Sequence, residues 1–451
     1  MLGTTPPGWP FVAKLSFLCR CRLFSRQRFL LASILIPPVF RKVVHLKNFC
    51  YYSPIITPMR KHQTIYLDYA AATPLDERVL KVMLPYFKNE FGNPSSMHHK
   101  GTAAKAALDA GRKSVAEVLN ARPEEVVFTG GGTESCNLAI LGSAQLTVRG
   151  HVITTAIEHH AVLDPIRQLI KRGWKATFLP VDQEGRIMLQ GLKNAIRKDT
   201  RLVSIMYANN EIGSIQPIAQ AGKFISEFNI LRAKKQLPPI VFHTDASQAA
   251  GCLDLDVNRL RVDLLSASSS KFYGPKGVGF LYVRKGTPME AVIYGGGQEK
   301  NLRSGTENVP GIAGLAAALA FTQTDKHKES LRLKKLQAYL LNGIQKLLKG
   351  AKINGPHQDL SLRLPNNVNF TIPGIEGEAL VLYLDAAGIC VSTGSACATG
   401  STDASHVLLA IGMDEKEAKQ GIRVSIGKET TMQDIKYFLK VLAAKVKLLK
   451  N

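Results

Sequence analysis

Apolar and polar positions after residue 58 alternate between two patterns, short apolar runs and longer stretches with apolar residues at helical spacing. The apolar runs with the length of buried strands are 125–129, 151–155, 176–179, 202–207, 240–244, 263–266 and 279–283. Amphipathic stretches such as 103–119 and 218–228 separate them. Strands that alternate with helices are typical of a largely parallel sheet covered on both faces. The pattern therefore predicts an α/β fold with a mostly parallel, seven-stranded sheet.

The pattern changes after residue 310, where helical spacing extends over 311–320 and again over 328–348. Strand-like runs follow near 367–371 and 390–392, and two helical stretches then lead to the last residue. This order is typical of a smaller α+β domain. The expected organisation is a large domain at 73–315 and a small domain formed by 59–72 and 316–451.

The first 58 residues differ from the rest, because they carry eight Lys and Arg and no Asp or Glu. Their longest apolar run, 29–36, is far shorter than the roughly 20 residues that span a membrane. An Arg-rich leader without acids resembles an organellar transit peptide, while a secretory signal fits poorly because no small-residue cleavage site follows the run. The favoured interpretation is a non-native extension, with translation beginning at Met59. We expect a cytoplasmic location, or a mitochondrial or other organellar one if 1–58 is a genuine transit peptide.

The composition, with 45% hydrophobic and 21% charged residues among 451, is globular and excludes disordered, collagen-like and coiled-coil chains. Beyond the first 58 residues, 50 basic residues stand against 35 acidic ones, a net charge of +15. These charges are scattered, without the basic stripe and interleaved aromatic residues that predict a nucleic-acid groove. Seven cysteines are too few for a disulfide scaffold, which favours a reducing compartment.

A glycine-rich loop, 130–135 (GGGTES), follows a predicted strand and opens a helical stretch. Glycines let backbone amides approach an anion, and the start of a helix supplies donors and a positive dipole end. Thr133 and Ser135 add hydroxyl donors. The loop suits phosphate binding, and it also suits a tight turn in which Thr133 caps the helix.

Two further loops place charged residues at the ends of predicted strands. Asp245 lies where open α/β sheets bind ligands, and an acid there either pairs with a protonated ring nitrogen or caps a helix. Lys271 follows a run of small and hydroxyl residues and precedes a Gly-Pro turn. A lysine in a desolvated site can lose its proton and react with a carbonyl group. Lys276 is its competitor within the same loop.

Cys397 stands among small, polar residues in what we expect to be an exposed loop, so it is the candidate nucleophile. Cys136, Cys252 and Cys390 have apolar or helical settings instead. The adjacent histidine pairs of the chain lack zinc-like spacing, so no metal site is predicted. His159, in one of these pairs, could cover an aromatic ring, although a histidine at a strand end is more often structural.

Taken together, the motifs resemble the cysteine desulfurases of the NifS/IscS type, pyridoxal-phosphate enzymes within the class-V aminotransferase group. The resemblance covers about 64–428 and implies a fold-type-I transferase. Its motifs, in chain order, are 66–71, 93–96, 130–135, 158–159, 209–213, 245–248, 271–277, 303–306 and 394–397.

The resemblance implies roles around the cofactor ring. Lys271 would bind pyridoxal 5'-phosphate covalently and later move a substrate proton. Asp245 would pair with the ring nitrogen, Gln248 would contact the ring oxygen, and His159 would stack on the ring. Asn210 would steady the cofactor or the substrate.

The resemblance also implies a phosphate site and a substrate site. Ser270 stands where the family usually has a histidine, and its hydroxyl can still donate to the phosphate. Arg423 would clamp the substrate carboxylate through two parallel bonds. The other residues expected at the phosphate are Gly132, Thr133, Ser268 and, from a second subunit, Thr306.

The activity that the resemblance implies is conversion of L-cysteine to L-alanine, with a persulfide left on Cys397. The sulfur would pass to an acceptor protein for iron–sulfur clusters or for thiolation of tRNA or cofactors. A homodimer is implied, with no direct nucleic-acid or membrane partner. Two alternatives stay open, a selenocysteine lyase of the same fold and a non-catalytic regulatory homologue.

Overall fold

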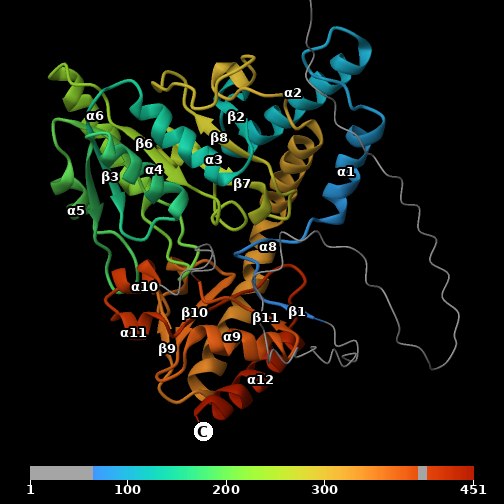
Figure 1. Ribbon diagram of the computed structural model, residues 1–451, viewed down its shortest axis with the longest axis vertical. Helices are drawn as coiled ribbons and strands as arrows, with labels where there is room; N and C mark the ends of the chain where they lie inside the picture. Colours follow the sequence, from blue (N-terminus) through green and yellow to red (C-terminus); the bar gives the residue numbers. More distant parts are fainter. Residues whose placement is uncertain (1–63, 395–403, 451) are drawn as a thin grey trace, which may run out of the picture. The chain divides into compact units, whose positions relative to one another are not determined.

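The structure is a computed structural model that describes residues 64–394 and 404–450. Its larger sheet has seven strands in the order β2-β8-β7-β6-β5-β3-β4 (Figure 1). The strands are β2 (Val126–Thr129), β3 (His151–Thr155), β4 (Lys175–Leu179), β5 (Thr200–Ser204), β6 (Val241–Asp245), β7 (Leu264–Ser268) and β8 (Gly279–Val283). Neighbours from β4 to β7 run parallel, whereas β8 is antiparallel to both β2 and β7. The predicted α/β fold with a mostly parallel seven-stranded sheet is confirmed.

Helices cover both faces of this sheet, so its strands are apolar on both sides. On β6, Val241 belongs to one hydrophobic cluster and Phe242 to another, and Leu264 and Leu265 divide in the same way on β7. The helices of this part are α1 (Glu77–Lys88), α2 (His99–Leu119), α3 (Gly132–Asn137), α4 (His160–Lys171), α5 (Leu189–Ala195), α6 (Ile218–Lys234) and α7 (Val257–Leu260).

A second, antiparallel sheet has the order β12-β10-β9, and a two-stranded parallel pair joins β1 to β11. Their bounds are β1 (Ile65–Tyr66), β9 (Lys352–Asn354), β10 (Asn367–Thr371), β11 (Ile389–Cys390) and β12 (Gly421–Ser425). Val368 and Phe370 of β10 and Ile422 and Val424 of β12 form a separate apolar core. Helices α9 (Gly377–Asp385) and α12 (Met432–Lys450) pack on this core. Helices α10 (His406–Ala410) and α11 (Glu415–Ala418) form a further apolar cluster with Ile157, Met206 and Ile212.

One sequence expectation for this part is confirmed and one was wrong. The helical pattern over 311–320 and 328–348 is confirmed, and both stretches belong to one helix, α8 (Val309–Leu347). Strand β12 precedes α12, where the sequence pattern predicted only helices. Buried polar residues in β12, Arg423 and Ser425, interrupt the apolar pattern that would have marked it as a strand.

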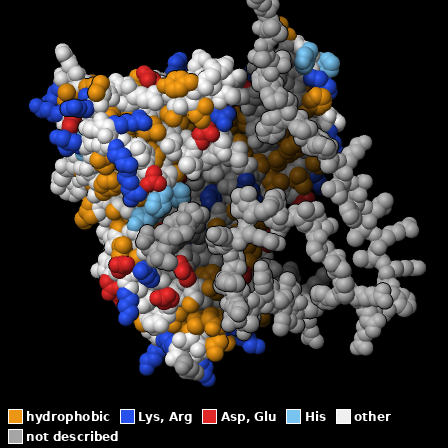
Figure 2. Space-filling view, in the orientation of Figure 1, with side chains coloured by type: hydrophobic (Ala, Val, Ile, Leu, Met, Phe, Trp, Pro, Cys, Tyr) orange, Lys and Arg blue, Asp and Glu red, His pale blue; other side chains and the backbone are white. Residues whose placement is uncertain are grey.

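Helix α8 joins the two cores within one compact unit, Lys61–Asn451. Residues from Ile312 to Leu319 lie in the core of the seven-stranded sheet, and residues from Leu333 to Ile344 lie in the second core (Figure 1). The division into domains at 73–315 and at 59–72 with 316–451 stays a prediction. Among the described residues, every helix is too short or too polar to cross a membrane. On the face shown in Figure 2, basic side chains are mixed with acidic and apolar ones.

Candidate active site

Residues at the ends of three parallel strands meet at one edge of the seven-stranded sheet. Asp245 ends β6, Lys271 follows β7, and His159 follows β3, where it caps the start of α4. Because β3, β5, β6 and β7 are parallel, their carboxyl ends lie along the same edge. The charges of Asp245 and Lys271 both act on the His159 ring. This arrangement is consistent with the sequence expectation that the three residues lie together.

His159 is held as a neutral ring with a fixed orientation. Its Nδ1 accepts a hydrogen bond from the Ala161 backbone N–H at 3.0 Å, which leaves the proton on Nε2. Burial lowers the pKa of His159 from its usual value; the negative charge of Asp245 opposes this shift, and the positive charge of Lys271 adds to it. A neutral, oriented ring of this kind can stack on a planar group.

Lys271 projects toward the segment that follows β1. Its Nζ donates to the carbonyl oxygens of Ala70, at 3.0 Å, and Ala71, at 2.6 Å. Gln248 Nε2 donates to the same Ala70 oxygen at 3.0 Å, so the two side chains converge. Lys276, the competitor in the sequence, instead donates to the Thr73 carbonyl at 2.9 Å. Of the two lysines, Lys271 lies in the turn directly after β7, and its charge acts on the His159 ring.

The glycine-rich loop forms a cradle lined with hydroxyl groups. A Cβ atom on Gly132 would lie 3.1 Å from both Ser247 Oγ and Ser268 Cβ. Ser268 Oγ lies 3.1 Å from Ser270 Oγ. Three serine hydroxyls thus gather where glycine lets the backbone approach, which suits a phosphate group. Ser247 stands in the 245–248 motif but was not among the residues expected at the phosphate.

Helix α3 begins two residues earlier than a Thr133 cap would allow. Gly131 occupies the cap position with φ of 149°, and Thr133 lies in the first turn. Glu134 accepts from the Gly130 backbone N–H at 2.9 Å and from Arg303 Nε at 2.8 Å. The alternative of Thr133 as a helix cap is wrong, and the ion pair fixes the first half of the loop.

Two buried neighbours of Asp245, His243 and Cys136, are uncharged at neutral pH. Its Oδ1 accepts from the Ser247 backbone N–H at 2.9 Å. Burial lowers the pKa of His243 to about 4, and Ser204 and Ser266 bond its two ring nitrogens. Burial, and then the negative charge of Asp245, raise the pKa of the Cys136 thiol well above its usual value. At neutral pH, neither His243 nor Cys136 carries a charge beside Asp245.

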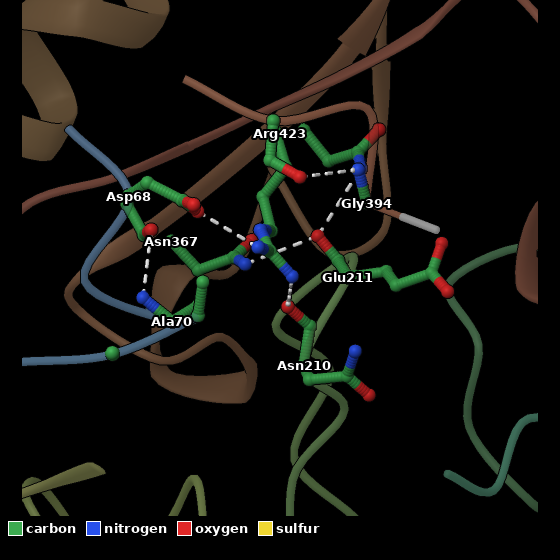
Figure 3. Close-up of polar contacts among 12 residues, drawn as sticks. Asp68, Ala70, Asn210, Glu211, Asn367, Gly394 and Arg423 are labelled. Atoms are coloured by element: carbon green, nitrogen blue, oxygen red, sulfur yellow. Dashed lines mark hydrogen bonds and ion pairs between the residues drawn. The ribbon is translucent and has the colours of Figure 1, made fainter. Parts of the chain in front are cut away.

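Arg423, from β12 of the second sheet, points toward Asp68 and Asn210 (Figure 3). Its Nη2 bonds Asp68 Oδ1 at 2.8 Å, and its Nη1 donates to the Asn210 carbonyl oxygen at 3.2 Å. The side chain is only 3% exposed, yet its Nε has no hydrogen-bond partner among the described residues. A buried guanidinium with an unused N–H donor can bind a further anionic group.

Not every predicted site residue can be placed. Cys397 lies outside the described residues, as do the cysteines of the first 58 positions. Thr306 is exposed, and its expected place in a second subunit stays a prediction. Cys136 is buried, as expected, while Cys252 and Cys390 are half-buried.

The class-V aminotransferase family matches residues 65–438. The chain belongs to the class-V aminotransferase family. A cysteine desulfurase IscS from Dictyoglomus turgidum is 47% identical over 380 residues, which are 84% of this chain and 93% of that relative. A cysteine desulfurase IscS from Methanosarcina thermophila is 44% identical over 394 residues, 87% and 94% of the two chains.

Solved structures give the same result. A NifS-like protein has a TM-score of 0.78 and 38% identity, over 85% of this chain and 100% of its own. A structure titled "SspA in complex with cysteine" has a TM-score of 0.69 and 36% identity, over 80% of this chain and 99% of that one. The resemblance to cysteine desulfurases that the motifs indicated is confirmed.

Pyridoxal phosphate, the cofactor of this class-V family, fits the residues present. The Gly132 cradle suits its phosphate because a side chain there would displace the serine hydroxyls. Asp245 is a buried carboxylate suited to a protonated ring nitrogen, with Lys271 and His159 beside it.

Proposed function

We propose that this protein is a pyridoxal-phosphate-dependent cysteine desulfurase that converts L-cysteine to L-alanine and leaves the sulfur as a persulfide on Cys397. The observation that carries the proposal is the meeting of Lys271, Asp245 and His159 at one sheet edge, faced by the buried Arg423. Relatives named cysteine desulfurase, and the solved relative in complex with cysteine, support the same reaction and substrate.

The cofactor would be held at both ends. Lys271 Nζ would bind its aldehyde carbon, and Asp245 would keep its ring nitrogen protonated. His159 would stack on the ring, and Gln248 would donate to the ring oxygen. The residues proposed for its phosphate are Gly132, Thr133, Ser247, Ser268, Ser270 and, from a second subunit, Thr306.

When bound, pyridoxal phosphate supplies an electron sink for the charge that develops at the substrate Cα. Lys271 Nζ would carry the proton that leaves the substrate Cα. Arg423 would bind the substrate carboxylate, with Asn210 beside it. The Cys397 thiolate would attack the substrate sulfur, so that the new S–S bond replaces the broken C–S bond and the three-carbon product leaves as L-alanine.

The test is L-alanine release by the purified full-length chain, supplied with pyridoxal phosphate, L-cysteine and a thiol reductant. We expect one alanine per sulfide, and loss of turnover in a Cys397→Ala variant that still binds the cofactor. Absence of alanine from folded, cofactor-loaded wild-type protein would contradict the proposal.

A homodimer forms part of the proposal. A cavity of about 510 Å³ adjoins the phosphate cradle and is lined by residues such as Gly131, Thr133, Ile293 and Arg303. Tyr294, next to this lining, is 74% exposed. An apolar surface next to a charged ligand site suits cover by a second copy. Sedimentation equilibrium should give twice the chain mass, and a monomer at micromolar concentration would contradict this.

The sulfur acceptor and the location are also proposals. We propose an acceptor protein that feeds iron–sulfur cluster assembly or thiolation of tRNA or cofactors, and a cytoplasmic location. An acceptor would be recognised by transfer of ³⁵S from labelled L-cysteine through Cys397 to a thiol of the partner. Transfer that persists in Cys397→Ala would exclude this route.

A further inference from the structure

The carboxylate of Glu211 contacts residues on both sides of the Cys397 segment. Ser405 Oγ donates to Glu211 Oε2 at 2.5 Å. Gly394 lies so close that a Cβ atom there would be 3.0 Å from the same Oε2. Glu211 is 3% exposed and Ser405 is 4% exposed, so the contact is shielded from water. One buried oxygen therefore lies between the last described residues before Cys397 and the first ones after it.

The local conformations of Gly394 and Ser405 both favour their contact with Glu211. Gly394 has φ of +93°, a conformation that side chains disfavour, and a side chain would also collide with Glu211. Its backbone N–H donates to Ser392 Oγ at 3.2 Å. Ser405 caps α10, because its Oγ accepts from the Leu408 backbone N–H at 3.2 Å. The same serine hydroxyl thus joins the start of α10 to Glu211.

The backbone of Glu211 is held independently of its side chain. Its N–H donates to Asn209 Oδ1 at 2.8 Å. Its carbonyl oxygen accepts from Asn367 Nδ2 at 3.0 Å and from Asn369 Nδ2 at 3.1 Å. These asparagines alternate along β10 with Val368 and Phe370 of the apolar core, so they lie on the opposite face of the strand. Truncating the Glu211 side chain should therefore leave this turn in place.

The same turn also touches the proposed substrate site. Arg423 Nη1 donates to the carbonyl oxygen of Asn210, the residue before Glu211 (Figure 3). Asn209 Nδ2 donates to the Ile157 carbonyl at 2.9 Å, two residues before His159. A single turn thus connects the guanidinium, the histidine strand end and the residues that flank Cys397.

We propose that Glu211 is a positioning residue for sulfur transfer, which holds Gly394 and Ser405, the described residues on either side of the Cys397 segment. This inference rests on the proposed function. The proposed function assigns Glu211 no contact with the substrate or the cofactor and no proton transfer. It acts through Ser405 and Gly394, and its effect is expected in the transfer step because a misplacement of about 1 Å can cost roughly a hundredfold in rate.

The test compares full-length, cofactor-loaded variants in L-alanine release. Glu211→Ala should lower kcat at least tenfold while KM for L-cysteine stays within twofold, because Asn210 and Arg423 keep their contact. Glu211→Gln retains an oxygen that can accept from Ser405 and should recover most of kcat. Ser405→Ala removes the same bond from the other side, and combining it with Glu211→Ala should add little. Glu415→Ala, whose side chain is 74% exposed, is the matched control and should match wild type.

The outcomes separate this inference from the proposed function. Wild-type protein without alanine release would defeat the proposed function itself. Active wild type with unchanged kcat in Glu211→Ala would overturn the positioning role alone. Parallel loss of cysteine affinity and cofactor binding would also overturn it, because that pattern indicates a general structural role. Should Glu211→Ala not fold, Ser405→Ala decides, with kcat at least threefold below wild type expected and an unchanged kcat overturning the inference.

Discussion

Arg112 and Arg423 are both buried arginines that face a carboxylate, but they are satisfied to different degrees. Arg112 makes two parallel bonds with Glu299, Nη2 to Oε1 at 2.6 Å and Nη1 to Oε2 at 2.8 Å. It also donates to the Val126 carbonyl and lies 4.9 Å from the Phe128 ring centre. Glu299 in turn accepts from the Phe128 backbone N–H at 2.8 Å. The donors and acceptors of this pair are matched within the fold.

Arg423 is less completely paired. It makes one bond to Asp68 and one to the Asn210 carbonyl, and its buried Nε has no partner among the described residues. Asp68 is also more exposed, at 18% of its side chain, than Glu299, at 2%. A buried donor without a partner costs free energy in the fold and becomes useful when a ligand supplies the acceptor. The difference separates a structural ion pair from a proposed binding site.

The largest effect is expected when the matched pair is broken. Arg112→Met leaves Glu299 buried without its cation, and the free energy of unfolding should fall by about 3–5 kcal/mol. Urea denaturation of the full-length protein measures this change. KM for L-cysteine should stay at the wild-type value in the folded fraction. A matching loss of cysteine affinity would show that this pair also serves the binding site.

The second-largest effect is expected for Arg423→Lys, which should weaken substrate binding and leave stability nearly unchanged. A lysine cannot make two parallel bonds to a carboxylate, so kcat/KM for L-cysteine should fall about a hundredfold, roughly 2.7 kcal/mol, mainly through KM. The free energy of unfolding should change by less than about 1 kcal/mol, because Arg423 is poorly satisfied without substrate. Steady-state kinetics and urea denaturation on the same preparation test both statements. A large stability loss with unchanged KM would make Arg423 structural.

Local sequence patterns could predict the sheet because its strands are short apolar runs between helices. The segment 321–327, which joins the two helical stretches of α8, is harder to predict, since polar residues interrupt the apolar spacing there. Thr322 Oγ1 donates to the Phe272 carbonyl at 3.2 Å, and Gln323 Nε2 donates to the Ala250 carbonyl at 2.8 Å. These polar side chains satisfy backbone groups of the neighbouring core. A polar residue that the tertiary structure requires looks, in the sequence alone, like the end of a helix.

The residues of the candidate site also differ in how far the sequence could predict them. Asp245 and Lys271 could be predicted because each follows an apolar strand, and resemblance to a family added Arg423. The pairing of Arg112 with Glu299, 187 positions apart, and of Glu211 with Ser405, 194 positions apart, leaves no local pattern. Such contacts depend on which loops the fold brings together.

Glu158 offers a smaller test, because its Oε2 is also buried without a partner among the described residues. Burial raises the pKa of Glu158 to about 8 from 4.5. The folded protein then binds more protons than the unfolded chain between these values, so stability falls as pH rises through the window and is unaffected by this group below about 4.5. From pH 6 to pH 7 the fall should be about 1.4 kcal/mol. Glu158→Gln should remove that slope in urea denaturation, and an identical slope in both proteins would contradict the assignment.

The smallest effect is expected for Asp68, whose carboxylate bonds Arg423 in the structure. If Asp68 occupies donors that the substrate needs, Asp68→Asn should weaken its hold and lower KM for L-cysteine about threefold, roughly 0.6 kcal/mol. A matched change in the structural pair, Glu299→Gln, should leave KM unchanged and lower stability instead. A higher KM in Asp68→Asn would mean that Asp68 orients the guanidinium and does not compete for it. Arg423 would then resemble Arg112 in needing its acid partner, and only its unpartnered Nε would distinguish the two sites.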